Sequence, residues 1–424
     1  MNVIIQRERK VQMADLQFIH AADLHLDSPF QGLSHLPERI FRRVQDSTFT
    51  SFTRIVDEAI RREVDFVLLA GDLYDGEDRS LKAQSRLKVE MKRLEQANIA
   101  VYVIHGNHDH LSGRWARLDW PSNVYFFRDE VEVFEYGRGG DVLAHIYGYS
   151  YPRREVIENI SKKYTKKTGA RYHIGLLHGQ AQGSKGHDPY APFSVQELLD
   201  KEFDYWALGH IHQYQQLDPT ILYPGNIQGR NRKEIGEKGC VVVHLSESKM
   251  ATEFVATADI IWKNTKVSIT GVDSVQEIID RCEEAVESNR ERGHGVMLTF
   301  TFVGHGPLHS VLADEEQVHE WLNELNDREE RHHSFVWIVS YQRQTTIAWD
   351  RDRFRQEDHI ISDFIGVVDQ RKQDQDFFTK ATAQLYKHRR AKRYLEALSS
   401  EEQERLIEEA EALIISELLK EDEQ

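Results

Sequence analysis

The fold is decided by one stretch, Asp65-Phe66-Val67-Leu68-Leu69-Ala70-Gly71-Asp72-Leu73-Tyr74-Asp75. Its short apolar run carries no internal charge and ends at a glycine, which is typical of a strand buried on both faces. In an open α/β sheet, chemistry gathers in the crevice at the carboxyl ends of such strands. The stretch therefore predicts that the Asp72 carboxylate faces this crevice, and we expect it to bridge two metal ions.

The composition indicates a folded protein of more than one domain. The 424 residues exceed what one core usually holds, and 40% of them are hydrophobic. No apolar run approaches the roughly 18 residues that a membrane-spanning helix needs. Two cysteines, Cys240 and Cys282, form no disulfide framework and favour a reducing, cytoplasmic location. Residues 1–12 do not resemble a signal peptide, and we expect them to be a dispensable extension.

The net charge of −16 argues against non-specific nucleic-acid binding by the whole surface. A local site for phosphate remains open, because bound divalent metals would reverse the sign of the charge there.

The regions on either side of the opening stretch alternate between strand and helix patterns. Residues 16–22 and 99–104 are predicted strands, and residues 38–62 and 80–96 are predicted helices. This order predicts βαβ units with right-handed crossovers, and therefore a parallel sheet.

Shorter runs and crowded glycines in residues 124–149 favour antiparallel or mixed strands. Residues 173–177 and 203–208 are further predicted strands, and residues 221–223 and 240–245 are expected to complete a second sheet.

Beyond residue 258 the pattern changes to a small α+β module. Its predicted strands and helices are 265–269, 274–289, 296–302, 315–325 and 335–341. The chain is predicted to turn helical after Asp374. The last helix has an apolar stripe at Ile407, Ala410, Ile414 and Leu418. This stripe predicts either a helix packed back on its own domain or one that docks on a partner's coiled coil.

Five separate apolar runs end in side chains that can bind metal. They supply Asp23 and His25, Asp72, Asn107 and His108, His178, and His210 and His212. With 21 histidines in the chain, a single one could be an ordinary loop or core residue, and Asp72 alone could be a turn aspartate. The predicted fold places all five strand ends along one crevice, so their coincidence favours a metal site.

The residue types suit two transition-metal ions. Carboxylate, amide and imidazole ligands form a mixed oxygen and nitrogen shell that suits Mn, Fe or Zn better than Ca or Mg alone. Two such ions about 3.5–4 Å apart clamp the attacking and leaving oxygens of an in-line displacement at phosphorus and make hydroxide available near neutral pH. We expect two divalent ions, with Mn favoured and Fe, Zn and Mg as alternatives.

His108 directly follows the ligand Asn107, so its ring is expected beside the metals, where a general acid for the leaving oxygen belongs. Asp75 is close enough in sequence to Asp72 to orient and charge this ring, and Asp109 is the competing partner.

These motifs resemble those of the calcineurin-like metallophosphoesterases. The matching segments are Asp23-Leu24-His25, Gly71-Asp72-Leu73-Tyr74-Asp75, Gly106-Asn107-His108-Asp109, His178 and Gly209-His210-Ile211-His212, all in the family's order. Within the superfamily the chain is similar to the SbcD-type DNA repair exonucleases. It most resembles their YhaO-like branch, because His25 is followed by Leu26-Asp27-Ser28-Pro29-Phe30.

The resemblance implies an α/β fold, a two-sheet αββα metallophosphoesterase sandwich over residues 15–258. By position it puts one metal on Asp23, His25, Asp72 and His212, and a second on Asp72, Asn107, His178 and His210. It makes His108 the catalytic histidine. It also implies a small α+β capping domain at 262–356 that shapes DNA access, and a C-terminal helical segment at 375–424 that grips an SMC-like coiled-coil ATPase of the SbcC or YhaN type.

The expected function is a two-metal DNA phosphodiesterase, a 3′-to-5′ exonuclease with endonuclease activity on single strands, working in DNA repair or end processing. The many acids of the predicted cap, such as Glu315 and Glu316, weaken the case for DNA. A cyclic nucleotide or small phosphate ester is the alternative substrate, and a non-catalytic regulatory subunit of the ATPase is the third interpretation. A homodimer is left open, and no membrane association is expected.

Basic residues between Arg153 and Arg171 form one charged run, and Arg230, Arg232 and Lys233 form a second. Such runs indicate either a solvated surface or contacts with a phosphate backbone beside the crevice.

Overall fold

The computed structural model describes residues 15–30, 32–33, 35–76, 80–114, 116, 118–182, 190–247, 249–346, 351–356, 360–374, 376–388 and 398–421. The predicted extension, residues 1–12, lies outside the described residues. The chain divides into two compact units. The first runs to Lys263 and includes Arg290–Met297 and Glu329–Trp337, and the second holds Asn264–Asn289, Leu298–Arg328 and the chain from Ile338 onward. Among the described helices, none is long and apolar enough to cross a membrane.

The first unit contains two six-stranded sheets. In spatial order, the first sheet holds β12 (Met250–Ala256), β11 (Gly239–Leu245), β1 (Leu16–Ala21), β2 (Phe66–Ala70), β3 (Ala100–Ile104) and β4 (Val124–Phe126). The second holds β5 (Glu132–Arg138), β6 (Asp141–Gly148), β7 (Tyr172–His178), β8 (Tyr205–Gly209), β10 (Ile221–Tyr223) and β9 (Gln215–Asp218). Strands β1 to β4 are mutually parallel, as are β6, β7, β8 and β10. Consequently the carboxyl ends of the ligand-bearing strands of each sheet meet at one edge.

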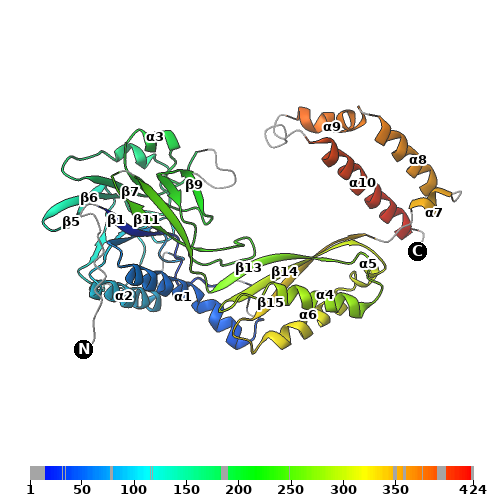
Figure 1. Ribbon diagram of the computed structural model, residues 1–424, viewed down its shortest axis with the longest axis horizontal. Helices are drawn as coiled ribbons and strands as arrows, with labels where there is room; N and C mark the ends of the chain where they lie inside the picture. Colours follow the sequence, from blue (N-terminus) through cyan, green and yellow to red (C-terminus); the bar gives the residue numbers. More distant parts are fainter. Residues whose placement is uncertain are drawn as a thin grey trace, which may run out of the picture. The chain divides into compact units, whose positions relative to one another are not determined.

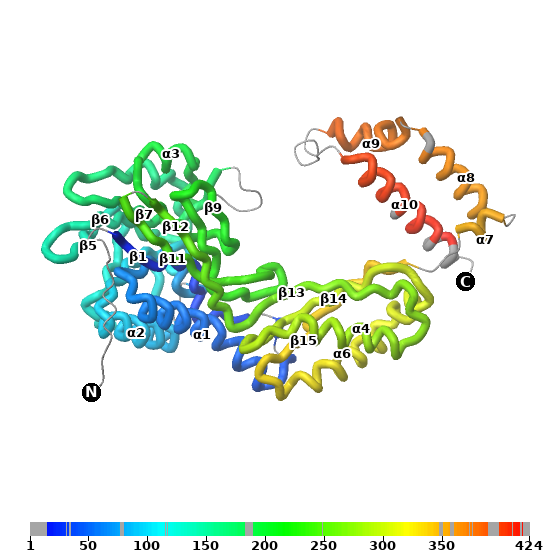
Figure 2. Tube along the Cα trace, viewed as in Figure 1, coloured from blue at the N-terminus to red at the C-terminus, as the bar shows by residue number. Residues whose placement is uncertain are grey.

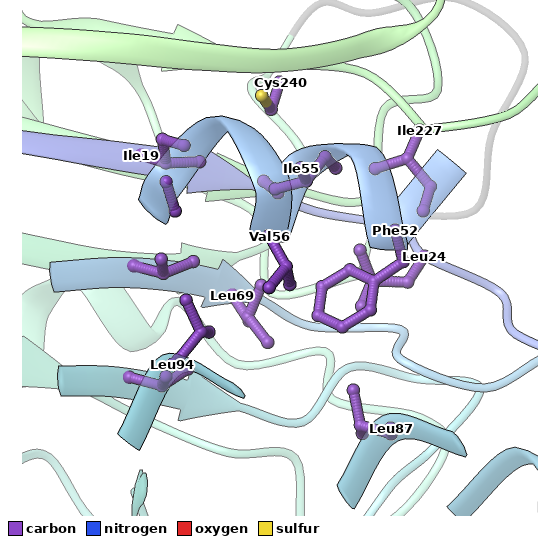
Figure 3. Close-up of a cluster of buried hydrophobic side chains, with 14 of the residues drawn as sticks. Ile19, Leu24, Phe52, Ile55, Val56, Leu69, Leu87, Leu94, Ile227 and Cys240 are labelled. Carbon is purple, nitrogen blue, oxygen red and sulfur yellow. The ribbon is translucent and has the colours of Figure 1, made fainter. Parts of the chain in front are cut away.

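Helices α1 (Glu38–Arg62) and α2 (Leu81–Gln96) cover the outer face of the first sheet (Figure 1). The apolar side chains of α1 recur at helical spacing, so that Phe52, Ile55 and Val56 enter the core. The Ser80 hydroxyl begins α2 by accepting a hydrogen bond from the Ala83 amide at 3.0 Å. Figure 3 shows the resulting cluster, in which Ile19 and Leu69 of the sheet meet both helices.

A second buried cluster fills the space between the two sheets. Phe18 and Phe66 pair in register on β1 and β2, and their rings stack at a centroid distance of 4.9 Å. Tyr205 of the second sheet meets Phe18 edge to face at 5.5 Å. A short helix, α3 (Val195–Leu199), and a 3-10 turn, η1 (Ile160–Lys163), cover the outer face of the second sheet. The layers confirm the predicted α/β fold with a two-sheet sandwich.

The prediction for residues 240–245 was wrong, because β11 joins the first sheet and not the second. It pairs antiparallel with β1, from Leu16 opposite Leu245 to His20 opposite Val241. Figure 2 shows β1 and β11 running side by side although the chain between them is long. Both edges of β1 need partners within the sandwich, and the buried Val241, Val242 and Val243 supply an apolar strand for the second edge.

The chain after residue 259 contains a three-stranded sheet in the order β13, β14, β15. The elements here are β13 (Ile260–Ser268), α4 (Val275–Ser288), β14 (Gly295–His305), α5 (Leu308–Val311), α6 (Glu315–Glu329) and β15 (Val336–Thr346). The observed order agrees with the predicted α+β pattern, with strands longer than expected. Ser274 begins α4 by accepting a hydrogen bond from the Glu277 amide.

In the described part of the chain beyond residue 350, the helices are α7 (Arg351–Gln356), α8 (Ile360–Gln373), α9 (Phe377–Lys387) and α10 (Ser400–Glu421). Helical structure thus begins before Asp374, earlier than predicted, because Ile361 and Ile365 of α8 pack against Ile415 of α10. The predicted stripe on α10 is correct in part. Leu418 packs against this cluster, but Ile415 is buried in place of the predicted Ile414, which is 44% exposed.

Candidate metal centre

The first sheet supplies acids, an amide and two histidines from the loops that follow β1, β2 and β3. Backbone hydrogen bonds hold the first two loops together, from the Asp23 amide to the Gly71 carbonyl at 3.1 Å and from the His25 amide to the Asp72 carbonyl at 3.0 Å. The His108 amide donates to Asp72 Oδ1 at 2.9 Å, which joins the third loop to the second. These bonds fix Asp72 between the loops that follow β1 and β3.

The second sheet supplies the remaining histidines. His178 ends β7, and His210 and His212 follow β8. The His210 amide donates to both carboxylate oxygens of Asp23 at 3.1 Å, which connects the strand ends of the two sheets. All seven predicted ligands therefore lie along one seam of the sandwich.

One group of donors consists of Asp23, His25 and His212, whose ligand atoms lie within 4.8 Å of one another. Nε2 of His25 is 3.1 Å from Nε2 of His212. These three residues belong to the set predicted for the first metal.

A second group consists of Asp23, Asp72 and His178. Nε2 of His178 and Nδ1 of His210 both approach Asn107 Oδ1, at 3.0 and 3.2 Å. Asp72 Oδ2 is 3.5 Å from Nε2 of His178 and 3.9 Å from Nε2 of His25. Asp72 thus lies between the two sets of nitrogens, where a bridging carboxylate would stand.

Hydrogen bonds turn the Nε2 atoms of His178 and His212 inward. Nδ1 of His178 lies 3.0 Å from the Ala70 carbonyl and Nδ1 of His212 lies 2.9 Å from Glu234 Oε1, which assigns the ring hydrogen of each to Nδ1 and leaves a lone pair on Nε2. Nδ1 of His25 lies 2.9 Å from Asp75 Oδ1 but makes no hydrogen bond within the described residues. A cation between the facing Nε2 atoms of His25 and His212 would stabilise both rings, so these residues fit a divalent metal.

Electrostatics at the site also favour cations. Burial, together with the neighbouring Asp72 charge, raises the pKa of Asp23 well above its ordinary value. Burial likewise raises the pKa of Asp72. Burial lowers the pKa of His178 to about 4 and that of His25 well below its usual range, so both rings are neutral at neutral pH. Two buried carboxylates beside neutral imidazoles are stabilised by divalent cations.

Two glycines allow this close approach. A Cβ on Gly106 would stand 2.3 Å from Asp72 Oδ1 and 2.7 Å from His178 Nε2, and one on Gly71 would stand 2.4 Å from His178 Nδ1. Gly71 also has a φ of +92°. Glycine is therefore required before Asp72 and before Asn107, because a side chain at either position would meet the His178 ring.

His108 lies at the wall of the site, with its ring edge to face with His25 at a centroid distance of 5.1 Å. Ligand atoms of His25, Asp75 and His108 lie within 4.8 Å of one another, but the close contacts of Asp75 are with His25, Ser28 and Arg230. Asp109, the competing partner, lies 3.0 Å from His105 Nδ1 and accepts the Gly106 amide at 2.7 Å. Asp75 is thus placed nearer to His25 than to His108.

Sequence reasoning missed two residues that hold the His212 loop. Glu234 accepts from His212, and Lys238 Nζ donates to the His212 carbonyl at 2.6 Å. Burial would raise the pKa of Glu234, but the bond from His212 and the Arg230 charge outweigh it and lower that pKa. The sequence signal for these two residues was the polar segment between β10 and β11. In the structure, Asn226 and Gln228 of this segment are buried.

A cavity of about 720 Å³ opens at the centre, lined by residues that include Asp72, His108, His210 and His212. Arg154, Tyr190 and Lys233 also line it. Other cations of the first basic run contact acids or carbonyls, as Lys163 does with Glu158 at 3.0 Å and Lys166 with the Glu202 carbonyl at 2.6 Å.

Two parts of the chain match known protein families. Residues 16–214 match the family Calcineurin-like phosphoesterase, and residues 262–346 match Metallophosphoesterase YhaO, middle domain.

Similar proteins extend over most of the chain. It is 43% identical over 337 residues to the "Uncharacterized metallophosphoesterase YhaO" of Bacillus subtilis (strain 168), covering 78% of this chain and 83% of that protein. It is 27% identical over 305 residues to the "DNA double-strand break repair protein Mre11" of Sulfurisphaera tokodaii, covering 66% of this chain and 72% of the relative. The protein of the same name from Methanocaldococcus jannaschii is 26% identical over 289 residues, with 63% and 73% covered.

Proposed function

Because this chain belongs to the calcineurin-like metallophosphoesterases and shares the YhaO middle domain, we propose that it is a two-metal phosphodiesterase that cleaves DNA. We propose further that it works as a 3′-to-5′ exonuclease with endonuclease activity on single strands. The observation that carries the proposal is Asp72 Oδ2 between the inward-facing nitrogens of His25 and His178. DNA as the substrate is supported by the Mre11 relatives, which are named for double-strand break repair.

In this proposal Asp23, His25, Asp72 and His212 hold one ion, and Asp72, Asn107, His178 and His210 hold the other. When bound, the two ions supply Lewis acidity at phosphorus and lower the pKa of a water molecule toward neutrality, with Mn as our first choice.

The chain's own residues supply the proton transfer and the positioning. The His108 ring faces the cavity beside His25, where it donates a proton to the departing sugar oxygen. Its backbone amide meanwhile holds Oδ1 of Asp72. Arg154 and Lys233 at the cavity wall offer positive charge to a phosphate backbone.

The assay compares Asp72→Asn and His108→Gln with an exposed control, Asp129→Asn, on single-stranded DNA and on bis-p-nitrophenyl phosphate with Mn²⁺. Asp72→Asn should lose both activities. His108→Gln should lose about 10²–10⁴-fold on DNA and much less on the p-nitrophenyl ester, whose leaving group needs no proton. Full turnover by Asp72→Asn would refute the two-metal assignment.

A small phosphate ester is the second candidate substrate. Several lysines of the first basic run are paired with acids, as Lys162 is with Glu197 at 3.8 Å and Lys163 with Glu158. Because these lysines are already neutralised, they offer less positive charge to a DNA backbone, and this favours a small ester. Including cyclic AMP in the same panel separates the candidates, and better turnover of cyclic AMP than of DNA at low concentration would favour the ester.

We also propose that the C-terminal helices bind an SbcC- or YhaN-like coiled-coil ATPase. Leu385 of α9 is 52% exposed, and Leu413 of α10 is 60% exposed, so apolar side chains are available for a partner helix. ATP-dependent DNA cleavage by the mixed proteins tests this partnership.

A further inference from the structure

Arg230 lies behind the candidate metal centre, in the segment between β10 and β11. Its side chain is 14% exposed. Nη1 donates to Asp75 Oδ1, and Nη2 is 3.4 Å from Glu234 Oε1. The guanidinium therefore spans two carboxylates, and these carboxylates belong to different loops.

Each of the two carboxylates contacts one of the predicted ligands. Asp75 Oδ1 is 2.9 Å from His25 Nδ1, and Glu234 Oε1 is 2.9 Å from His212 Nδ1. On their inner sides, the same two rings bring their Nε2 atoms to within 3.1 Å of each other. The five side chains thus form a closed ring of contacts, with Arg230 opposite the point where the two Nε2 atoms meet.

The second oxygen of each carboxylate is also held in place. Ser28 Oγ donates to Asp75 Oδ2 at 3.1 Å. Glu234 Oε2 accepts from Asn226 Nδ2 and from the Arg230 amide, both at 2.8 Å. Each carboxylate therefore has one oxygen fixed by its own neighbourhood and the other shared between Arg230 and a histidine.

We propose that Arg230 is a positioning residue that sets the orientation of His25 and His212 together for one metal ion. The inference rests on the proposed two-metal site. A planar guanidinium with two terminal nitrogens can contact both carboxylates at once, whereas an ammonium is a single point charge. The contacts of Arg230 fit neither of the two interpretations of its basic run, a solvated surface or a phosphate contact, because both terminal nitrogens are engaged inside the protein.

The experiment measures Mn²⁺ binding to metal-stripped protein by calorimetry, for wild type, Arg230→Gln and Arg230→Lys. The matched control is Arg62→Gln, because Arg62 is 16% exposed and also joins two acids, Glu58 and Glu253, away from the site. Urea unfolding of each metal-free variant reports the cost to the fold.

Arg230→Gln should weaken one of the two binding events by about 10–100-fold and leave the other unchanged, as expected when a group behind a metal ligand is removed. Arg230→Lys should remain weakened by a similar factor, because the charge is retained and the two-pronged geometry is lost. Arg62→Gln should lower stability with wild-type affinity for both ions.

Wild-type affinity for both ions in Arg230→Gln would overturn the inference, as would full rescue by Arg230→Lys or equal weakening of both events. A wild-type protein that binds no Mn²⁺ would instead refute the two-metal site itself, so the two failures are distinguishable.

Discussion

Four of the proposed ligands hold their backbone in the left-handed region. The φ angles are 52° for Asp23, 42° for His25, 51° for Asp72 and 101° for His210. Non-glycine residues in such conformations cost about 1–3 kcal/mol each and persist where the surroundings fix them. Here the backbone hydrogen bonds between the first two loops support Asp23, His25 and Asp72, and the bonds from the His210 amide to the Asp23 carboxylate support His210. Strain at this seam is consistent with side chains that are held for binding.

A substitution at Gly106 tests how closely the ligands are packed. Gly106→Ala should weaken Mn²⁺ binding and lower kcat/KM for phosphodiester cleavage by about 10²-fold, because a misplacement near 1 Å has an effect of this size. The cause is a Cβ that would contact Asp72 Oδ1 and His178 Nε2.

Gly366→Ala is the matched control, since a Cβ there meets nothing within 4 Å. It should keep wild-type activity. Wild-type metal affinity in Gly106→Ala would contradict the prediction, because the loops after β2 and β3 would then have moved to make room for the added Cβ.

The individual ligands could be predicted from the sequence because each directly follows an apolar run, and strand ends converge. The residues behind them could not. Arg230 and Glu234 belong to a polar segment with no strand or helix period, and their partners, Asp75 and His212, are distant in sequence. The pairing of Asp75 with His108 was inferred from sequence proximity alone, whereas the fold places Asp75 2.9 Å from His25 Nδ1.

Among the elements, the first two helices and the parallel strands followed their patterns, whereas the start of the C-terminal helices and the pairing of β11 did not. The period of α1 predicts its bounds because one face is buried. Nothing in the apolar sequence of β11 indicates which sheet it joins, since a strand buried on both faces suits either one. Similarly, adjacent isoleucines in α10 left its buried face ambiguous by one residue.

The packing of α8 on α10 can be tested with those adjacent residues. Ile415→Ala should destabilise the helical segment by about 2–4 kcal/mol, because Ile415 is fully buried among Ile361 and Ile365. Leu413→Ala, at a position that is 60% exposed, should change stability by less than about 0.5 kcal/mol. Limited proteolysis of the C-terminal helices measures both, and equal protection of the two variants would contradict the observed register.

On the scale of the whole molecule, the candidate centre takes ligands from both sheets, so bound metal should stabilise the sandwich as a unit. At free Mn²⁺ 100-fold above Kd, each ion contributes about 2.7 kcal/mol. Chelation, which removes both ions, should therefore lower the Tm by about 10–20 °C for a unit of this size.

The Asp72→Asn variant should show a smaller response to chelator, which serves as the control for effects unrelated to the site. Identical wild-type melting curves with Mn²⁺ and with chelator, by calorimetry, would mean that the two sheets do not share a metal.

The position of β11 between β1 and β12 has a consequence for synthesis. As the chain leaves the ribosome, β1 can pair with β2 early, but its other edge stays open until residues 239–245 have emerged. An unpaired apolar edge templates association with other chains. A nascent or truncated chain that stops before Gly239 should therefore aggregate, even though it already carries every proposed ligand.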